Sequence, residues 1–252
     1  MSELFSIQLQ NRQQQGRDGV WLDLPTTTEQ VQAALRQIGI SSDNPQGLFI
    51  SGYFAEEEKR FAIPYNMVLA SNVDELNFLA ARLETLSAGE RAELNAALQA
   101  TQSELSSIGR ITDFPENVDY YVHLPEVHGP AQLGDYYLNR SGMVDMPEEW
   151  KGGIDTAQFG RYVAQQEQGV FTQYGYLVKS GDEWQKVHEG QPVPEEYRVL
   201  SFPVSEILRD AANIPPPVQP ETEPQKVIPI ILNGKDSAER MKEITDRLET
   251  GI

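Results

Sequence analysis

The chain has 252 residues, which predicts one or two domains, and 39% of them are hydrophobic, which is enough to build a buried core. It contains no cysteine, and this excludes disulfides, thiolate zinc sites and cysteine nucleophiles. With 38 acidic and 20 basic residues its formal net charge is −18, which disfavours nucleic acid and anionic membranes as partners and favours a positively charged one.

Residues 1–73 are predicted to form a small sheet with one helix. Apolar and polar residues alternate over residues 5–9, which indicates a strand, and the runs GVWLDL and GLFISGY indicate two more. Between these two runs, Thr26 and Glu29 have the spacing of a capping box, and Gly39 stands where a helix would end. We therefore expect an α+β unit here.

Residues 74–117 have the periodicity of helices. Two capping patterns, N-x-x-E from Asn72 and S-x-x-E from Ser87, are each followed by leucines at helical spacing. These leucines are Leu76, Leu79, Leu83, Leu86, Leu94 and Leu98. They predict two short helices packed as a hairpin, with a third, weaker helix over residues 103–108.

Residues 118–205 again favour an α+β unit. The run VDYYVHL predicts a strand, and PAQLGDYYLNRSG predicts a helix. Pro147 suits the first turn of a helix and Asp155 suits a cap. The runs GVFTQYGYLVK and EYRVLSF have the composition of strands.

Residues 206–252 differ in character from the rest. Six prolines within residues 214–229 exclude a helix or a central strand there and predict a stiff linker. Asp236 and Glu239 then have the spacing of a helix cap. The apolar face of this last helix would consist of Met241, Ile244 and Leu248.

The negative charge is concentrated in the middle of the chain. Residues 74–149 contain 14 acidic and 4 basic residues, a net charge of −10, whereas residues 1–73, 150–205 and 206–252 have nets of −3, −2 and −3. The acids are dispersed rather than run together, so folded elements could present them at intervals. This distribution favours an acidic surface over charge that serves solubility alone.

No motif for catalysis is found in the sequence. It lacks the patterns of a P-loop, a dinucleotide-binding fold, a zinc protease and a serine hydrolase, so we expect no catalytic, cofactor-binding or metal-binding residue and no enzyme. Its histidines, His123, His128 and His188, fit structural or surface roles. An acid-dependent hydrolase is the enzymatic alternative. Without a signal sequence or a long apolar stretch, we expect a cytoplasmic protein with no membrane contact.

Five segments in order resemble the ArdA antirestriction family, small acidic proteins of conjugative plasmids and transposons. Together they extend over about residues 5–180. The segments are GVWLDLP (19–25), DELNFLAARLETLS (74–87), LGDYYLNRSG (133–142), IDTAQFGRYV (154–163) and FTQYGYLV (171–178). The chain continues for some seventy residues beyond the usual end of that family.

The resemblance implies an elongated α+β protein of three small domains: α+β (1–73), helical (74–117) and α+β (118–205), followed here by the linker and helix of 206–252. It implies a homodimer whose carboxylates imitate the phosphates of bent DNA. The implied target is a Type I restriction-modification enzyme, bound in the groove of its specificity and methyltransferase subunits. A dimer would carry about −36, which matches about 60 Å of duplex.

The resemblance implies that the DNA-mimic surface consists of the acidic residues of the central segment. These are Asp74, Glu75, Glu84, Glu90, Glu93, Glu104, Asp113, Glu116, Asp119, Glu126, Asp135, Asp145, Glu148 and Glu149. Leu133, Tyr136 and Tyr137 are candidates for the dimer contact, with packing inside the fold as the alternative. The alternative function is a non-catalytic adaptor of a mobile genetic element that acts through its C-terminal helix.

Overall fold

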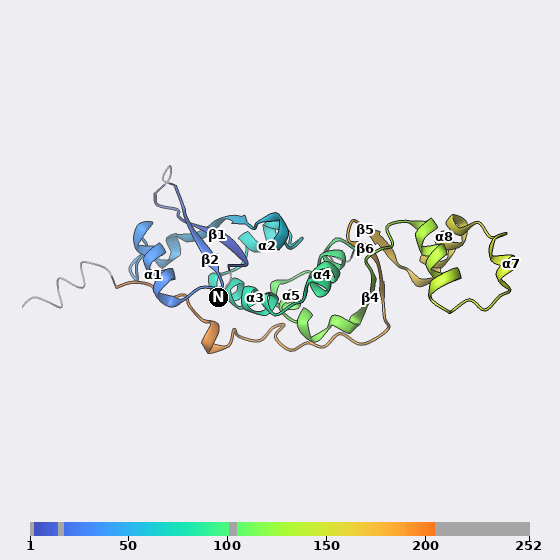
Figure 1. The fold of residues 1–252 in the computed structure, drawn as a ribbon. Coiled ribbons are helices and arrows are strands. Elements are labelled where there is room, and N and C mark those ends of the chain that lie inside the picture. The colour runs from blue at the N-terminus through green and yellow to red at the C-terminus, as the bar shows by residue number, and fades with distance from the viewer. Residues whose placement is uncertain (1–2, 15–17, 101–104, 205–252) are drawn as a thin grey trace, which may run out of the picture. The chain divides into compact units, whose positions relative to one another are not determined.

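The computed structural model describes residues 3–14, 18–100 and 105–204, all within the compact unit Met1–Arg209 (Figure 1). These residues form a mixed structure of helices and two small antiparallel sheets, as the α+β prediction requires. The division into domains 1–73, 74–117 and 118–205 stays a prediction. The predicted linker and C-terminal helix of 206–252 lie outside the described residues.

The first sheet is built from three strands, β1 (Phe5–Asn11), β2 (Val20–Leu24) and β3 (Leu48–Phe54), in the order β2-β1-β3. Its strands are antiparallel, and a bulge shifts the β1–β3 register between Gln8 and Leu9. Alternate β1 side chains are buried because they face the core, which confirms the strand predicted from the alternation.

The helix α1 (Thr28–Gln37) follows β2 and contacts it. Its cap is one residue later than predicted: the Thr27 hydroxyl accepts from the Gln30 backbone, and the Gln30 side chain accepts from Thr27 N–H. The pairing of Thr26 with Glu29 was therefore wrong, because a glutamine can close the box as well as a glutamate. Gly39 adopts φ +67° beyond the helix end, as its position predicted.

The helices α2 (Tyr65–Leu69), α3 (Val73–Glu84) and α4 (Ala88–Ala100) follow. Both predicted caps are confirmed: Asn72 accepts from Glu75 N–H, and Ser87 and Glu90 exchange two hydrogen bonds. All six leucines of the predicted stripes are buried. The helices form where the caps and the stripes predicted them.

The predicted helical hairpin was wrong. The helix α3 packs mainly on β2 and on α5 (Ile108–Thr112), and α4 packs mainly on the second sheet. The physical reason is that Leu94–Leu98 are all buried, so α4 needs a surface wider than one helix. The third helix begins at Ile108 after the cap Ser107, whereas the prediction ended it there.

The second sheet has strands β4 (Tyr121–Leu124), β5 (Val170–Thr172) and β6 (Gly175–Lys179), in the order β4-β6-β5. The strands are antiparallel, and β5 and β6 form a hairpin. The run VDYYVHL was predicted to be a strand and contains β4, whereas the predicted run GVFTQYGYLVK is divided into β5 and β6 by a turn. Between them the chain forms α6 (Pro130–Asp135), a π-helical turn (Tyr136–Arg140), α7 (Glu148–Lys151) and α8 (Thr156–Glu167), whose predicted cap Asp155 is confirmed.

The helices α6 and α8 pack unusually closely because a glycine lies on each of them. A side chain at Gly134 would meet the Thr156 carbonyl oxygen at 1.9 Å, and one at Gly160 would meet the Pro130 carbonyl oxygen at 1.8 Å. Only glycine lets the two backbones approach to this distance. Both glycines belong to the segments LGDYYLNRSG and IDTAQFGRYV, so the backbone approach explains one residue of each pattern.

Residues 180–203, which we call the strap, follow β6. They contain one short turn, Glu195–Tyr197, and no strand, so the strand expected for EYRVLSF was wrong. Further 3-10 turns are Pro45–Gly47, Glu57–Lys59, Phe114–Glu116 and Val118–Tyr120. The main hydrophobic core extends from Leu4 to Val199 of the strap, and a smaller core joins Leu133, Ala164 and Tyr176.

Candidate functional site: the carboxyl groups of residues 74–149

The acidic residues of the central segment differ in their exposure. Glu104 lies outside the described residues, and Asp113 is fully buried. The exposed residues are Asp119, Glu126, Asp145, Glu148 and Glu149. The partly buried residues are Asp74, Glu75, Glu84, Glu90, Glu93, Glu116 and Asp135. Most of the predicted set therefore reaches solvent, and Asp113 does not belong to any surface.

The exposed carboxyl groups are held by short local structures. Asp119 lies in a 3-10 turn, and Glu148 and Glu149 lie in the first turn of α7, where the helix dipole favours negative charge. Lys151 Nζ is 2.9 Å from Glu148 Oε2. On the π-helical turn, Arg140 donates hydrogen bonds to Asp135, which lowers the pKa of that carboxyl group. An ordinary folded surface thus presents these acids.

The neighbouring glutamates of α4 have opposite electrostatic environments. Hydrogen bonds from Ser87 lower the pKa of Glu90. Burial, together with the smaller effects of the charges of Glu90 and Asp119, raises the pKa of Glu93 to about 8. Glu93 Oε1 is buried without a hydrogen-bond partner among the described residues. Glu93 is therefore mostly protonated at pH 7 and does not contribute a full negative charge to a mimic surface.

We expect Glu93→Gln to stabilise the protein at alkaline pH. Glu93 ordinarily titrates near 4.5 but near 8 in the folded chain, so between these values only the folded state keeps the proton and its stability falls as pH rises. The variant loses this dependence. Because the group is partly exposed, we discount the effect to about 1–2 kcal/mol above pH 8. Urea unfolding from pH 5 to 9 measures it. A variant less stable than the parent at pH 9 would contradict the prediction.

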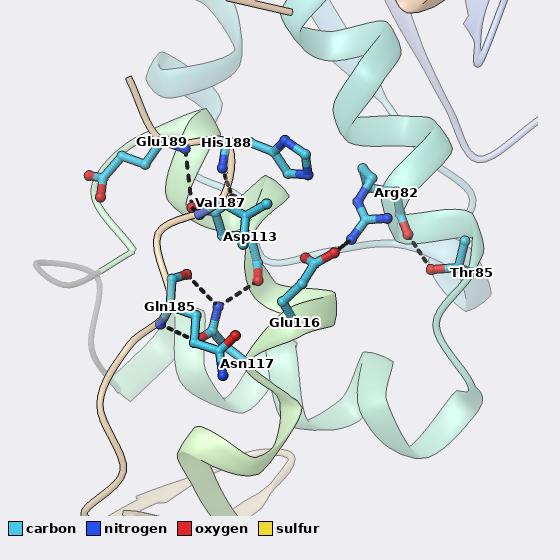
Figure 2. A network of polar contacts seen from close by, with 9 residues as sticks. All are labelled: Arg82, Thr85, Asp113, Glu116, Asn117, Gln185, Val187, His188 and Glu189. Carbon is cyan, nitrogen blue, oxygen red and sulfur yellow. Dashed lines mark hydrogen bonds and ion pairs between the residues drawn. The ribbon is translucent and has the colours of Figure 1, made fainter. Parts of the chain in front are cut away.

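Asp113 fastens the strap to the central helices. Its Oδ1 accepts from His188 N–H at 2.6 Å, and its Oδ2 accepts from Val187 and Glu189 N–H at 3.3 and 3.1 Å (Figure 2). The side chain is 0% exposed. A predicted DNA-mimic residue is thus a structural anchor, because its carboxyl group satisfies three backbone donors of a segment that forms no sheet.

Asn117 binds the strap beside Asp113. Its side-chain nitrogen donates to the carbonyls of Asp113 and Gln185, and its oxygen accepts from Gln185 N–H at 2.7 Å (Figure 2). Figure 2 also shows Arg82 of α3 in an ion pair with Glu116, so this partly buried acid is neutralised by its own chain. The residues around 113–117 therefore serve the fold more than a partner.

Asp74 and Asn77 hold the later part of the strap on α3. Asp74 Oδ1 accepts from Val199 and Leu200 N–H at 2.8 and 2.7 Å. These donors bond to a carboxyl group instead of a neighbouring strand, which explains why EYRVLSF forms no strand. Asn77 donates to the Tyr197 carbonyl and accepts from Thr26 N–H, so it connects the strap to the segment that leads into α1.

The candidate dimer residues lie mostly within the fold. Leu133 is fully buried in the smaller core, and Tyr136 and Tyr137 are partly buried against it. The Tyr137 hydroxyl donates to Glu167, as does that of Tyr176 at 3.0 Å. Packing inside the fold, the alternative left open by the sequence, accounts for Leu133. A dimer contact through this segment stays a prediction.

The histidines are separate from one another. His123 Nε2 lies 2.8 Å from the Tyr174 carbonyl oxygen, and the His188 ring packs edge-on against Phe78. Within the described ranges, no three His, Asp or Glu side chains lie close enough together to hold a metal ion. The same part of the chain contains no helix long and apolar enough to cross a membrane.

Comparison with family models identifies the family of this chain. Residues 15–178, about two thirds of its length, match the family described as antirestriction protein (ArdA). The chain belongs to the ArdA antirestriction family. Membership implies an antirestriction function, and the ArdA family is non-catalytic. No curated protein matches the chain at a significant level.

The ArdA match ends one residue before the end of β6, so the whole strap follows the family-like part. The sequence assigned no role to this addition. The structure shows that Asp74, Asn77, Asp113 and Asn117, all within the ArdA match, bind it through hydrogen bonds. One signal was present: Asn77 interrupts the apolar face of a helix between Leu76 and Phe78, and a buried amide needs polar partners.

Proposed function

We propose that this protein is a DNA mimic that inhibits a Type I restriction-modification enzyme by occupying the DNA-binding groove of its specificity and methyltransferase subunits. The observation that carries the proposal is the net charge of −10 on residues 74–149. Folded elements keep twelve of the thirteen described carboxyl groups there at least partly exposed. Lysine and arginine side chains that bind phosphates would bind such carboxylates as well.

The proposal includes a homodimer, whose charge of about −36 would match about 60 Å of duplex. Exposed apolar side chains support a contact between copies. Met143, Trp150 and Tyr162 are 76%, 67% and 60% exposed and lie in or beside the elements from the π-helical turn to α8. Large apolar side chains with this exposure are common at interfaces. The dimer face proposed here therefore contains Met143, Trp150 and Tyr162.

A competition assay tests the proposal. A purified Type I enzyme is bound to labelled target DNA, and the protein is titrated in at two salt concentrations. Displacement near one dimer per DNA site, with an affinity that falls as salt rises, supports mimicry because surface charge pairs are screened by ions. If micromolar protein displaced DNA from none of the tested Type I enzymes, the proposal would be refuted.

We expect deletion of residues 205–252 to leave this inhibition within about twofold of the parent, because the segment carries little of the net charge excess. The adaptor hypothesis expects the opposite, since it places the function in the C-terminal helix. The deletion keeps the strap and the residues Asp74 and Asp113 that bind it. Circular dichroism checks the fold, and the competition assay gives the result.

A further inference from the structure

A cavity of about 920 Å³ lies where the strap crosses the helices. Its walls include Met67 of α2, Phe78 of α3, Ile108 of α5 and His188 and Val193 of the strap. Its volume falls in the range of about 300–1,000 Å³ that is usual for small-molecule sites. Because the strap follows the ArdA match, this cavity depends on a part of the chain that the family model does not include.

The walls of the cavity combine apolar and aromatic side chains with polar ones. The rings of Phe78 and His188 meet edge to face with centroids 4.9 Å apart, and Met67, Ile108 and Val193 add aliphatic surface. Such walls suit the hydrocarbon part of a long side chain, which buries its stem and leaves a charged end for polar groups. The cavity is thus shaped for an amphipathic occupant rather than a purely polar one.

The charged groups that line the cavity are acidic. Among the lining residues of the described chain, Glu75 and Glu189 have carboxyl groups, and none is a lysine or an arginine. Lys186, which does not line the cavity, lies 3.2 Å from Glu189 Oε2. The Glu75 side chain is half-buried and makes no hydrogen bond or ion pair with the described residues. Its charge is therefore the one left for an occupant to balance.

We propose that this cavity binds one arginine side chain of the restriction enzyme, with its guanidinium group beside Glu75. The inference rests on the proposed function and names the contact that the enzyme makes at this point. Arginine fits better than lysine because its planar guanidinium stacks on aromatic rings and is more weakly hydrated. Grooves that bind DNA present arginines for phosphates, so such a side chain is available in the target.

The cavity would make the pair of guanidinium and Glu75 less sensitive to salt than pairs on the open surface. Carboxylates on the open surface gain little from each contact, and salt screens that gain. A guanidinium in the cavity beside the half-buried Glu75 would be less accessible to solvent ions than one on the open surface, and removal of one partner from such a pair costs more than loss of a rim contact. Glu75 is therefore the exception in a set whose other members contribute little one by one.

The test compares Glu75→Gln with Glu29→Gln in the full chain. Both residues are glutamates in the first turn of a helix, but Glu29 is exposed, lies outside residues 74–149 and does not line the cavity. We expect Glu75→Gln to weaken binding to the Type I enzyme about tenfold, at low and high salt alike, and Glu29→Gln to weaken it less than about twofold. Equal losses for the two variants would overturn the proposal. If the unmodified protein fails to bind any Type I enzyme, the proposed function fails instead.

A second measurement needs no enzyme. N-acetyl-arginine methylamide is titrated into the isotope-labelled protein, and the neutral isostere N-acetyl-citrulline methylamide serves as the control. We expect saturable shifts of the amide signals of Gly109 and Gly190, which line the cavity, with the arginine probe only, and their loss in Glu75→Gln. Equal shifts with both probes, or none with either, would show that the cavity does not select a guanidinium.

Discussion

Asp113→Asn is expected to destabilise the protein by about 3 kcal/mol and to release the strap. The substitution keeps the size of the side chain but replaces one acceptor oxygen by an NH₂ group that faces backbone N–H donors. At least one of the three donors, Val187, His188 or Glu189, then stays buried without a partner. Urea unfolding measures the loss, and hydrogen exchange of these amides shows whether the strap is the part released.

The matched control for this prediction is Asp119→Asn. Asp119 lies six residues further along the chain and is exposed, so its replacement should change the free energy of unfolding by less than about 0.5 kcal/mol. If the two variants were equally stable, the hydrogen bonds of Asp113 would not hold the strap. As the temperature rises, Asp113→Asn should lose antirestriction activity in step with its loss of folded structure. The reason is that the cavity and the Asp74 contacts depend on the same strap.

Neutralising the five exposed carboxyl groups of the central segment together is expected to weaken binding to the Type I enzyme on the order of 100- to 1,000-fold. The variant is Asp119→Asn, Glu126→Gln, Asp145→Asn, Glu148→Gln and Glu149→Gln. Exposed ion pairs contribute roughly 0.5–1 kcal/mol each, so five give a loss of this size, whereas any single change should cost less than about fivefold. The competition assay at low salt measures the loss.

The control variant removes the same number of charges elsewhere. It consists of Asp18→Asn, Asp43→Asn, Glu57→Gln, Glu183→Gln and Glu195→Gln, all exposed and all outside residues 74–149. Both variants change the formal net charge from −18 to −13. If the central segment is the mimic surface, the control variant should lose at least tenfold less binding affinity. If the two variants lost affinity equally, net charge rather than a built surface would explain the binding.

Local patterns predicted most of the helices and strands because each depends on few neighbouring residues. Asn72 and Ser87 were recognised as caps since a cap bonds to a residue three positions away. The β1 strand was recognised from its alternation, which follows from one face meeting the core. The register of the α1 cap was missed by one residue because Thr26 and Thr27 are both acceptable and the fold chooses between them.

The predictions that were wrong concern features that depend on long-range packing. The stripes of α3 and α4 are compatible with a hairpin, yet α4 packs on the second sheet, and no local pattern specifies which apolar surface a helix meets. The run EYRVLSF has the composition of a strand, but its amides bond to Asp74, 125 or more positions earlier. A contact at that separation cannot be seen in a window of a few residues.

The sequence by itself determined the charge, its concentration in residues 74–149, the family and most helices and strands, because composition and local periodicity do not depend on tertiary contacts. Only the tertiary structure decided the role of each acid. Asp113 and Asp119 look alike in the sequence, yet one is an anchor for the strap and the other faces solvent. Whether a carboxyl group can meet a partner depends on which segment covers it, and here a segment beyond the family match does so.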